Sequence, residues 1–234
     1  MMISMTIDVA ENPAWALRTA ALGAVVFDVL YVVHRLLQGL GPDDATPAGI
    51  SAFNVAHRSA LLASEVAVGL ALLAIIVFIA AFTSLIRQAG RDTLATAVTM
   101  SGAAFVAMGF ISQAAETALV GVADAGDQSA VLALNHLQGR IPIVWTITAL
   151  TVAVSFAGLR TRLLPTWLGV AGLVAAGVFV LGSMSSVLGR TVEGNSSLFG
   201  VGLFIVWLLL VAVCLWQAAG RAAPESEAEH DQKA

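Results

Sequence analysis

Six stretches of mostly apolar residues, each long enough to cross a lipid bilayer, dominate the sequence. They cover residues 14–37, 59–82, 94–122, 130–159, 166–188 and 197–216. A helix needs about 20 residues to cross about 30 Å of hydrocarbon. Because lipid offers no hydrogen-bond partners to an exposed backbone, each stretch is expected to be an α-helix. The sequence therefore predicts an all-α fold: a polytopic membrane bundle of six transmembrane helices.

The composition agrees with this reading and argues against a soluble globule. The 234 residues are 59% hydrophobic and 11% charged, with a mean hydropathy of +0.90, which leaves too little polar surface to face water. The links between the stretches are too short to fold alone. We expect an N-terminal tail over 1–12, one six-helix domain over 13–219, and an acidic, disordered C-terminal tail over 220–234.

Charge placement predicts the orientation. Positive residues favour the cytoplasmic side of short loops, and tryptophan favours the membrane interface. With six spans, one side holds Arg87, Arg91, Arg160, Arg162, Arg221, Trp15, Trp167 and Trp216. The links on the opposite side hold Asp43, Asp44, Asp124, Asp127 and Glu193, and Arg190 is the only basic residue of the fifth link. Both termini are therefore predicted to be cytoplasmic, in a multi-pass protein of the plasma membrane.

Two local patterns concern packing within the bundle. Gly169, Gly172 and Ala176 form one stripe of small residues, which lets membrane helices approach closely. Trp145 and Trp207 lie nearer the middle of their spans, where each indole N–H is expected to find a partner inside the bundle. The single cysteine, Cys214, excludes an intrachain disulfide and a multi-cysteine metal site.

Ten ionisable side chains in or beside the spans fall in the predicted outer half of the membrane. They are Asp28, His34, Arg35, His57, Arg58, Glu65, Glu116, His136, Arg140 and Arg190. Helical spacing puts several of them on shared faces. The predicted stripes are Asp28, Tyr31 and Arg35; Asn54, Arg58 and Glu65; Ser112 and Glu116; and His136 and Arg140. Polar stripes on four helices can converge only if they face one another.

These residues are predicted to lie at different depths in the membrane. Arg35, Arg58 and Arg190 lie near helix ends, where long side chains can reach the interface. Arg140 is the deepest, roughly 20 Å along its helix from Asp127. A lone charge at that depth costs at least ~2.5–3.5 kcal/mol, so Arg140 is expected to be paired with Glu65 or Glu116. Pro142 removes one helical donor and is expected to kink the helix there.

Two interpretations of this polar cluster carry equal weight. It could be a structural network that fixes how the helices pack, or a pocket, open to the outer side, for a small polar or amphipathic ligand. The ligand-binding residues of the second interpretation are Tyr31, His57, Arg58, Glu65, Glu116, His136 and Arg140. The sequence favours a non-enzymatic, receptor-like role, with the lipid bilayer and a small molecule as partners.

Alternatives from other classes stay open. An intramembrane enzyme could use Glu65 or His136 as general acid or base, or a His/carboxylate metal site built on His34, His57 and His136. A small transporter is the third reading. The sequence contains no signature for a cofactor, and no nucleic-acid patch. The oligomeric state and the ligand are left undetermined.

Short motifs indicate a family. The second span opens with Phe53-Asn54-Val55-Ala56-His57-Arg58, the fifth opens with 163–169 (LLPTWLG), and the last carries Trp207. Over about residues 14–218 the chain resembles a family of bacterial integral membrane proteins of unknown function, common in actinobacteria and bacilli. The resemblance implies six spans and brings no catalytic residues. The Arg-over-Lys composition is typical of a high-GC actinobacterial genome.

Overall fold

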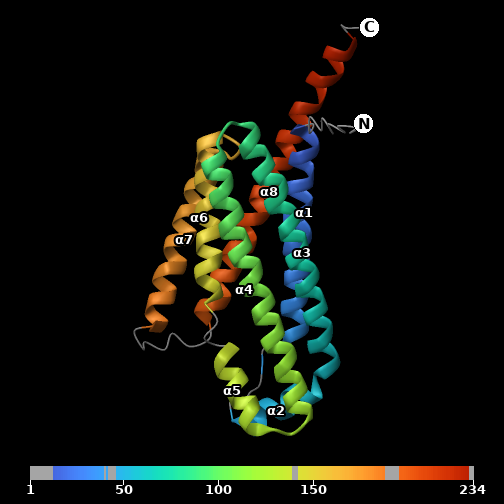
Figure 1. The fold of residues 1–234 in the computed structure, drawn as a ribbon, viewed down its shortest axis with the longest axis vertical. Helices are drawn as coiled ribbons and strands as arrows, with labels where there is room; N and C mark the ends of the chain where they lie inside the picture. The colour runs from blue at the N-terminus through green and yellow to red at the C-terminus, as the bar shows by residue number, and fades with distance from the viewer. Residues whose placement is uncertain (1–12, 40, 42–45, 139–141, 188–194, 232–234) are drawn as a thin grey trace, which may run out of the picture.

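A computed structural model shows an elongated bundle of long helices (Figure 1). It describes residues 13–39, 41, 46–138, 142–187 and 195–231, and their side chains except at 184–187, 195–199 and 223–231. The described residues form α1 (Pro13–Gln38), α2 (Pro47–Ala56), α3 (Arg58–Gln88), α4 (Asp92–Asp124), α5 (Gln128–Gln138), α6 (Ile143–Thr161), α7 (Thr166–Val187) and α8 (Asn195–Asp231). Six of the segments they form are long and apolar enough to cross a membrane. The predicted all-α, six-span fold is confirmed.

Neighbouring long helices run in opposite directions. Helix α1 packs against α3 and α8, α4 lies between α3 and α6, and α7 packs against α6 and α8. Helix α1 begins and α8 ends at the same end of the bundle (Figure 1). Large side chains, including Phe27, Phe78, Phe82, Phe204 and Leu208, fill the space between the helices.

The second span differs from the prediction at its start. A short helix, α2, lies between the first two predicted spans; Pro47 opens it, and the Thr46 hydroxyl accepts a hydrogen bond from the backbone N–H of Gly49 (3.2 Å). The helix ends at His57, where the backbone leaves the helical region before α3 begins. The predicted continuous stripe of Asn54, Arg58 and Glu65 is therefore wrong, because Asn54 belongs to a separate helix.

The fourth span is divided more sharply than the kink predicted at Pro142. Helix α5 ends at Gln138, and α6 begins at Ile143 with Pro142 before its first turn; residues 139–141 lie outside the described part. Asp127 caps α5, since its Oδ1 accepts from the backbone N–H groups of Ala130 and Ser129 (both 3.1 Å). These bonds hold the pKa of this loop carboxyl below its usual range. The span has two pieces because a proline interrupts the helical hydrogen bonds.

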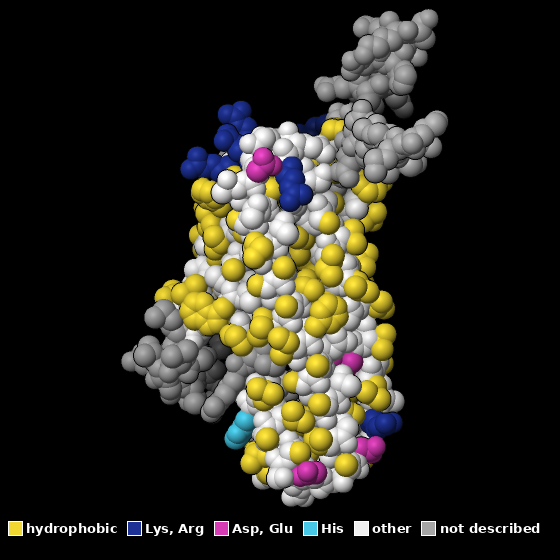
Figure 2. Space-filling view, in the orientation of Figure 1, with side chains coloured by type: hydrophobic (Ala, Val, Ile, Leu, Met, Phe, Trp, Pro, Cys, Tyr) yellow, Lys and Arg dark blue, Asp and Glu magenta, His cyan; other side chains and the backbone are white. Residues whose placement is uncertain are grey.

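Charge is unevenly distributed along the bundle. Figure 2 shows most Lys and Arg side chains at the end where α1 begins, whereas Asp and Glu lie mainly toward the opposite end. The exposed indoles of Trp15, Trp167 and Trp216 belong to the Arg-rich end. This pattern matches the one on which the orientation was predicted. The cytoplasmic location of that end stays a prediction.

The two central tryptophans differ in their surroundings. Trp207 is buried, and its Nε1–H donates to the backbone oxygen of Leu168 on α7 (3.2 Å), as expected. Trp145 is 45% exposed on the side of the bundle. Among the described residues no hydrogen bond joins its indole N–H to the bundle, so the expected inner partner is not found.

Small residues allow α7 to pack closely, as the sequence predicts. A Cβ atom at Gly172 would lie 2.1 Å from Ser155 Oγ and 2.6 Å from Trp207 Nε1, and one at Gly169 would lie 2.4 Å from Leu159 Cγ. Any larger side chain would push α7 away from α6 and α8. Helix α8 continues to Asp231, through most of the segment predicted to be a disordered tail. The disorder of that tail stays a prediction.

Candidate functional site

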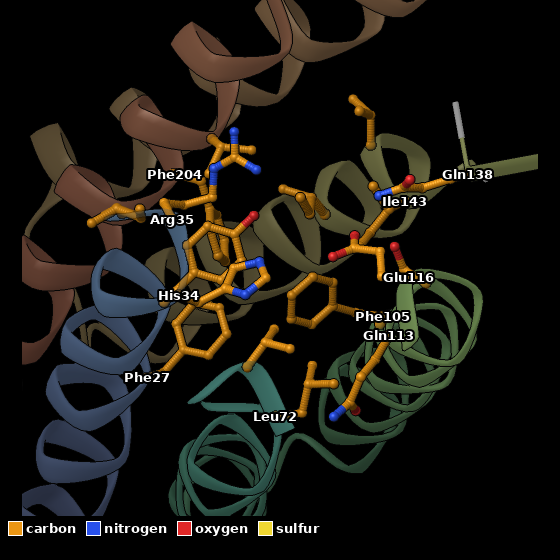
Figure 3. Close-up of a pocket in the computed structure, with 18 residues that line it drawn as sticks. Phe27, His34, Arg35, Leu72, Phe105, Gln113, Glu116, Gln138, Ile143 and Phe204 are labelled. Carbon is orange, nitrogen blue, oxygen red and sulfur yellow. The ribbon is translucent and has the colours of Figure 1, made fainter. Parts of the chain in front are cut away.

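A cavity of about 260 Å³ lies inside the bundle, where α1, α3, α4, α6 and α8 meet near the end of α5. We call it the aromatic cavity, and Figure 3 shows its lining side chains. It is lined by Phe27, Tyr31, His34, Arg35, Val68, Leu72, Phe105, Gly109, Ser112, Gln113, Glu116, Gln138, Ile143, Val144, Ile147, Val201, Phe204 and Ile205. Along both α1 and α4 the lining changes from apolar residues (Phe27 and Phe105) to polar ones (Arg35 and Glu116) in the direction of the chain.

Three phenylalanines from three helices form the apolar end. The ring centroids of Phe27, Phe105 and Phe204 lie 6.1 Å from one another in every pair. Tyr31 stacks on Phe27 at 5.7 Å, one turn further along α1. Such geometry is favourable for aromatic packing. The rings thus connect α1, α4 and α8 at the apolar end of the cavity.

A chain of hydrogen bonds forms the polar end. Arg35 Nη1 donates to Gln38 Oε1, and Gln38 Nε2 donates to Glu116 Oε2, both at 2.5 Å. All three side chains are half-buried. Gln38 suits this place because an amide can accept from a cation and donate to a carboxylate at once. The Gln38 amide thus connects the Arg35 guanidinium group on α1 to the Glu116 carboxylate on α4.

His34 adds a fixed imidazole to the cavity. Its Nδ1 lies 3.0 Å from the backbone oxygen of Ser64, and the Ser64 hydroxyl donates to the oxygen of Leu61 (2.7 Å). Since a carbonyl oxygen only accepts, Nδ1 carries the proton, and Nε2 of the neutral ring is left as an acceptor. Figure 3 shows the ring lying toward the cavity, and its centroid lies 5.5 Å from that of the Tyr31 ring.

Gln113 fixes the contact of α4 with α3. Its Nε2 donates to the backbone oxygen of Glu65 (2.7 Å). A Cβ atom on Gly69 would lie 2.9 Å from that nitrogen, so the absence of a side chain there lets the amide reach α3. The carboxyl side chains of Glu65 and Glu116 are thereby held on neighbouring helices.

A second cavity of about 200 Å³ adjoins the first, and we call it the carboxyl cavity. Arg35, Glu116 and Gln138 line both cavities, and Gln38 lines the second. The hydrogen-bond chain therefore lies in the wall that the two cavities share. Glu65 reaches only the carboxyl cavity; it is 6% exposed, and its Oε2 has no hydrogen-bond partner among the described residues.

The structure brings some of the candidate residues together and separates others. Tyr31 and Glu116 line the aromatic cavity, and Glu65 lines the carboxyl cavity. His57, Arg58 and His136 are exposed and line neither of them. Arg140, and with it the proposed pairing to Glu65 or Glu116, lies outside the described residues, as does Arg190.

Two candidates that lie away from the cavities, Arg58 and His57, make contacts on the exposed surface. Arg58 Nε lies 3.7 Å from Asp124 Oδ2, with both side chains more than half exposed; such a pair adds little stability. The His57 ring stacks on Phe53 at 4.4 Å, and its Nδ1 lies 3.0 Å from the backbone oxygen of Phe53. These contacts fix the junction between α2 and α3.

The structure does not support the metal alternative on His34, His57 and His136. Among the described residues, no group of three His, Cys, Asp or Glu side chains is placed to hold a metal ion. His34 is buried on α1, whereas His57 and His136 are exposed on other helices.

Several residues of the site were missed by the sequence reasoning. Arg35 was assigned to the interface, yet it hydrogen-bonds to Gln38 inside the bundle. The other missed residues are His34 as a cavity residue, Gln38, Gln113, Phe27, Phe105 and Phe204. The glutamines carried a usable signal, because an amide inside an apolar span also needs partners. The phenylalanines carried none, since such residues occur throughout membrane spans.

Asp28 on α1 is a second buried carboxyl group besides Glu65, and it lines neither cavity. It is 4% exposed, and neither of its oxygens has a hydrogen-bond partner among the described residues. A buried polar group without a partner costs about 1–3 kcal/mol. Replacing Asp28 by Val is expected to raise the free energy of unfolding in detergent by about that amount, as measured by titration with sodium dodecyl sulfate. A loss of stability would show that the carboxyl group has a stabilising partner.

Comparisons with known proteins do not assign this chain to a family. No protein-family model, no curated protein and no solved structure matches the chain. The resemblance to a bacterial membrane family therefore stays a prediction.

Proposed function

We propose that this chain is a multi-pass protein of the plasma membrane whose aromatic cavity binds a small amphipathic ligand from the outer side. One observation carries the proposal: a single space inside the spans combines an aromatic wall with a polar end. Pockets for small molecules are typically apolar, with a few polar groups that fix the orientation of the ligand. The separation of the two ends suits a molecule with one apolar and one polar end.

The polar end offers groups of several kinds. The described residues supply a cation in Arg35, a carboxyl group in Glu116 and a neutral acceptor in His34 Nε2. Gln38 already forms hydrogen bonds with both charged groups. A ligand must therefore replace one of these bonds, or bind to the donors and acceptors of Arg35 and Glu116 that Gln38 does not use. Binding is therefore expected to favour a ligand that both donates and accepts hydrogen bonds.

Filling the cavity tests this proposal. In the variant Ser112→Trp a large side chain is introduced into the lining, whereas in Ile111→Trp the same side chain is placed on the exposed neighbouring position. The proteins are purified in mild detergent, extracted with organic solvent and compared by mass spectrometry. We expect an amphipathic species in the wild-type and Ile111→Trp extracts that is lost from Ser112→Trp. Identical extracts, or no such species in the wild type, would count against a ligand pocket.

A further inference from the structure

A groove lies on the outside of the bundle between α3 and α4, away from both inner cavities. It encloses about 550 Å³. Its α3 wall contains Ile76, Ala80, Thr83 and Arg87, which follow one face of the helix at intervals of three or four residues. Its α4 wall is built largely from small residues. We call this feature the α3/α4 groove.

The length of the groove matches one leaflet of a bilayer. From Ile76 to Arg87 the helix advances by eleven residues, or about 16 Å at 1.5 Å per residue. That is about half of the ~30 Å of hydrocarbon that a span crosses. Arg87 lies in the last turn of α3, at the Arg-rich end of the bundle. The groove thus runs from the headgroup level toward the middle of the membrane.

Small side chains make the groove hollow, and its floor is closed. Gly102, Ala103 and Ala107 leave space along α4. A Cβ atom at Gly102 would lie 2.6 Å from Ile79 Cδ1, so the two helices already touch beneath the groove. The surface is therefore a shallow channel on the bundle and does not lead into its interior.

The polar atoms of the groove wall are already bonded to each other. Thr99 Oγ1 donates to the backbone oxygen of Ala95 (3.0 Å) and lies 3.3 Å from Thr83 Oγ1. Because a hydroxyl group has one proton, Thr83 must be the donor in the second bond. No free donor is left along these two side chains, so an apolar chain can cover them without loss of hydrogen bonds.

Arg87 differs from the rest of the lining. Its side chain is exposed, and no described residue forms an ion pair with it. Figure 2 shows hydrophobic side chains along the visible face of the bundle, with Lys and Arg side chains at its upper end. A guanidinium group suits phosphate oxygens, to which it can donate two parallel hydrogen bonds. The charge and the apolar groove together fit an anion that carries a long hydrocarbon chain.

We propose that the α3/α4 groove is a binding site for one anionic phospholipid, with an acyl chain along the groove and the phosphate group at Arg87. This site needs the membrane-spanning fold and is independent of a ligand in the aromatic cavity. A zwitterionic lipid binds less well because its ammonium group offsets the attraction to Arg87.

Native mass spectrometry of the full-length protein tests the site with two probes, phosphatidylglycerol and phosphatidylcholine of identical acyl chains. Arg87→Gln removes the groove cation, and Arg91→Gln removes a cation from the same link outside the groove. Ala103→Phe fills the groove, and Ala104→Phe adds the same ring beside it. Ala80→Leu, on the opposite wall, replaces Ala103→Phe should that variant not yield folded protein.

We expect one phosphatidylglycerol to be retained by the wild type, Arg91→Gln and Ala104→Phe in preference to phosphatidylcholine. Arg87→Gln is expected to lower that preference by about fivefold, as for one basic residue at a membrane surface. Ala103→Phe is expected to abolish retention. Equal retention of both lipids by the wild type, equal losses in Arg87→Gln and Arg91→Gln, or retention unchanged by filling the groove would each overturn the proposal.

Discussion

Replacing Gln38 by Met is expected to lower the free energy of unfolding in detergent by about 2–4 kcal/mol. The Gln38 amide makes two hydrogen bonds, one from Arg35 and one to Glu116. Bonds to charged groups contribute about 1.5–3 kcal/mol each, and half-burial lowers that contribution. Methionine keeps the length of the side chain and removes both bonds, so α1 and α4 lose their polar connection.

A double-mutant cycle distinguishes the loss of these hydrogen bonds from a simple loss of packing. Arg35→Met and Glu116→Met are each combined with Gln38→Met, and unfolding is followed in mixtures of dodecyl maltoside and sodium dodecyl sulfate. If the bonds exist, the double variants are more stable than the sum of the single losses predicts. The matched control is Gln88→Met at the exposed end of α3, where little change is expected. Additive losses at Gln38 would refute the hydrogen-bond chain.

Truncating Phe27 to Ala is expected to cost about 3 kcal/mol in the same measurement. Its ring is almost fully buried and touches the rings of Tyr31, Phe105 and Phe204. In a membrane the loss comes mainly from missing van der Waals contacts, because lipid is as apolar as the removed ring. The change also enlarges the aromatic cavity at its apolar end.

Phe110→Ala is the control for this effect, since Phe110 lies on the lipid-facing side of α4 and is exposed. Its removal is expected to change the stability by well under 1 kcal/mol. The intermediate variant Phe27→Leu is expected to fall between the wild type and Phe27→Ala. Equal losses at Phe27 and Phe110 would mean that the three-ring cluster contributes no specific packing.

The fold could be predicted from the sequence where the physical constraint was strong. Spans of about 20 apolar residues must be helices in lipid, and α4 and α7 begin and end within two residues of the predicted ranges. Prediction failed where a helix breaks within an apolar region. The turn at His57 and the division before Pro142 change which side chains share a face, and periodicity alone does not locate such breaks.

The site was predictable only through its charges. Glu65 and Glu116 stood out because carboxyl groups are rare in apolar spans, and both line cavities. Arg35 was misjudged, since closeness to a helix end says nothing about the direction of a long side chain. Gln38 donates a hydrogen bond to Glu116 (2.5 Å), and Gln113 donates one to the backbone oxygen of Glu65 (2.7 Å). Both bonds join different helices, so only the packing of α1, α3 and α4 creates them.

The proposed ligand requires that the aromatic cavity can be reached from the side opposite the chain termini. Ser112 lines the cavity, and the neighbouring Ile111 is 52% exposed on the outside of α4. In a Cys214→Ala background, Ser112→Cys and Ile111→Cys are treated in intact cells with a membrane-impermeant methanethiosulfonate reagent. A thiol in water forms the reactive thiolate far more readily than one in lipid. We predict rapid labelling of Ser112→Cys and none of Ile111→Cys; equal labelling of the two, or labelling of Ser112→Cys only after the cells are opened, would show that the cavity is closed to the outer side.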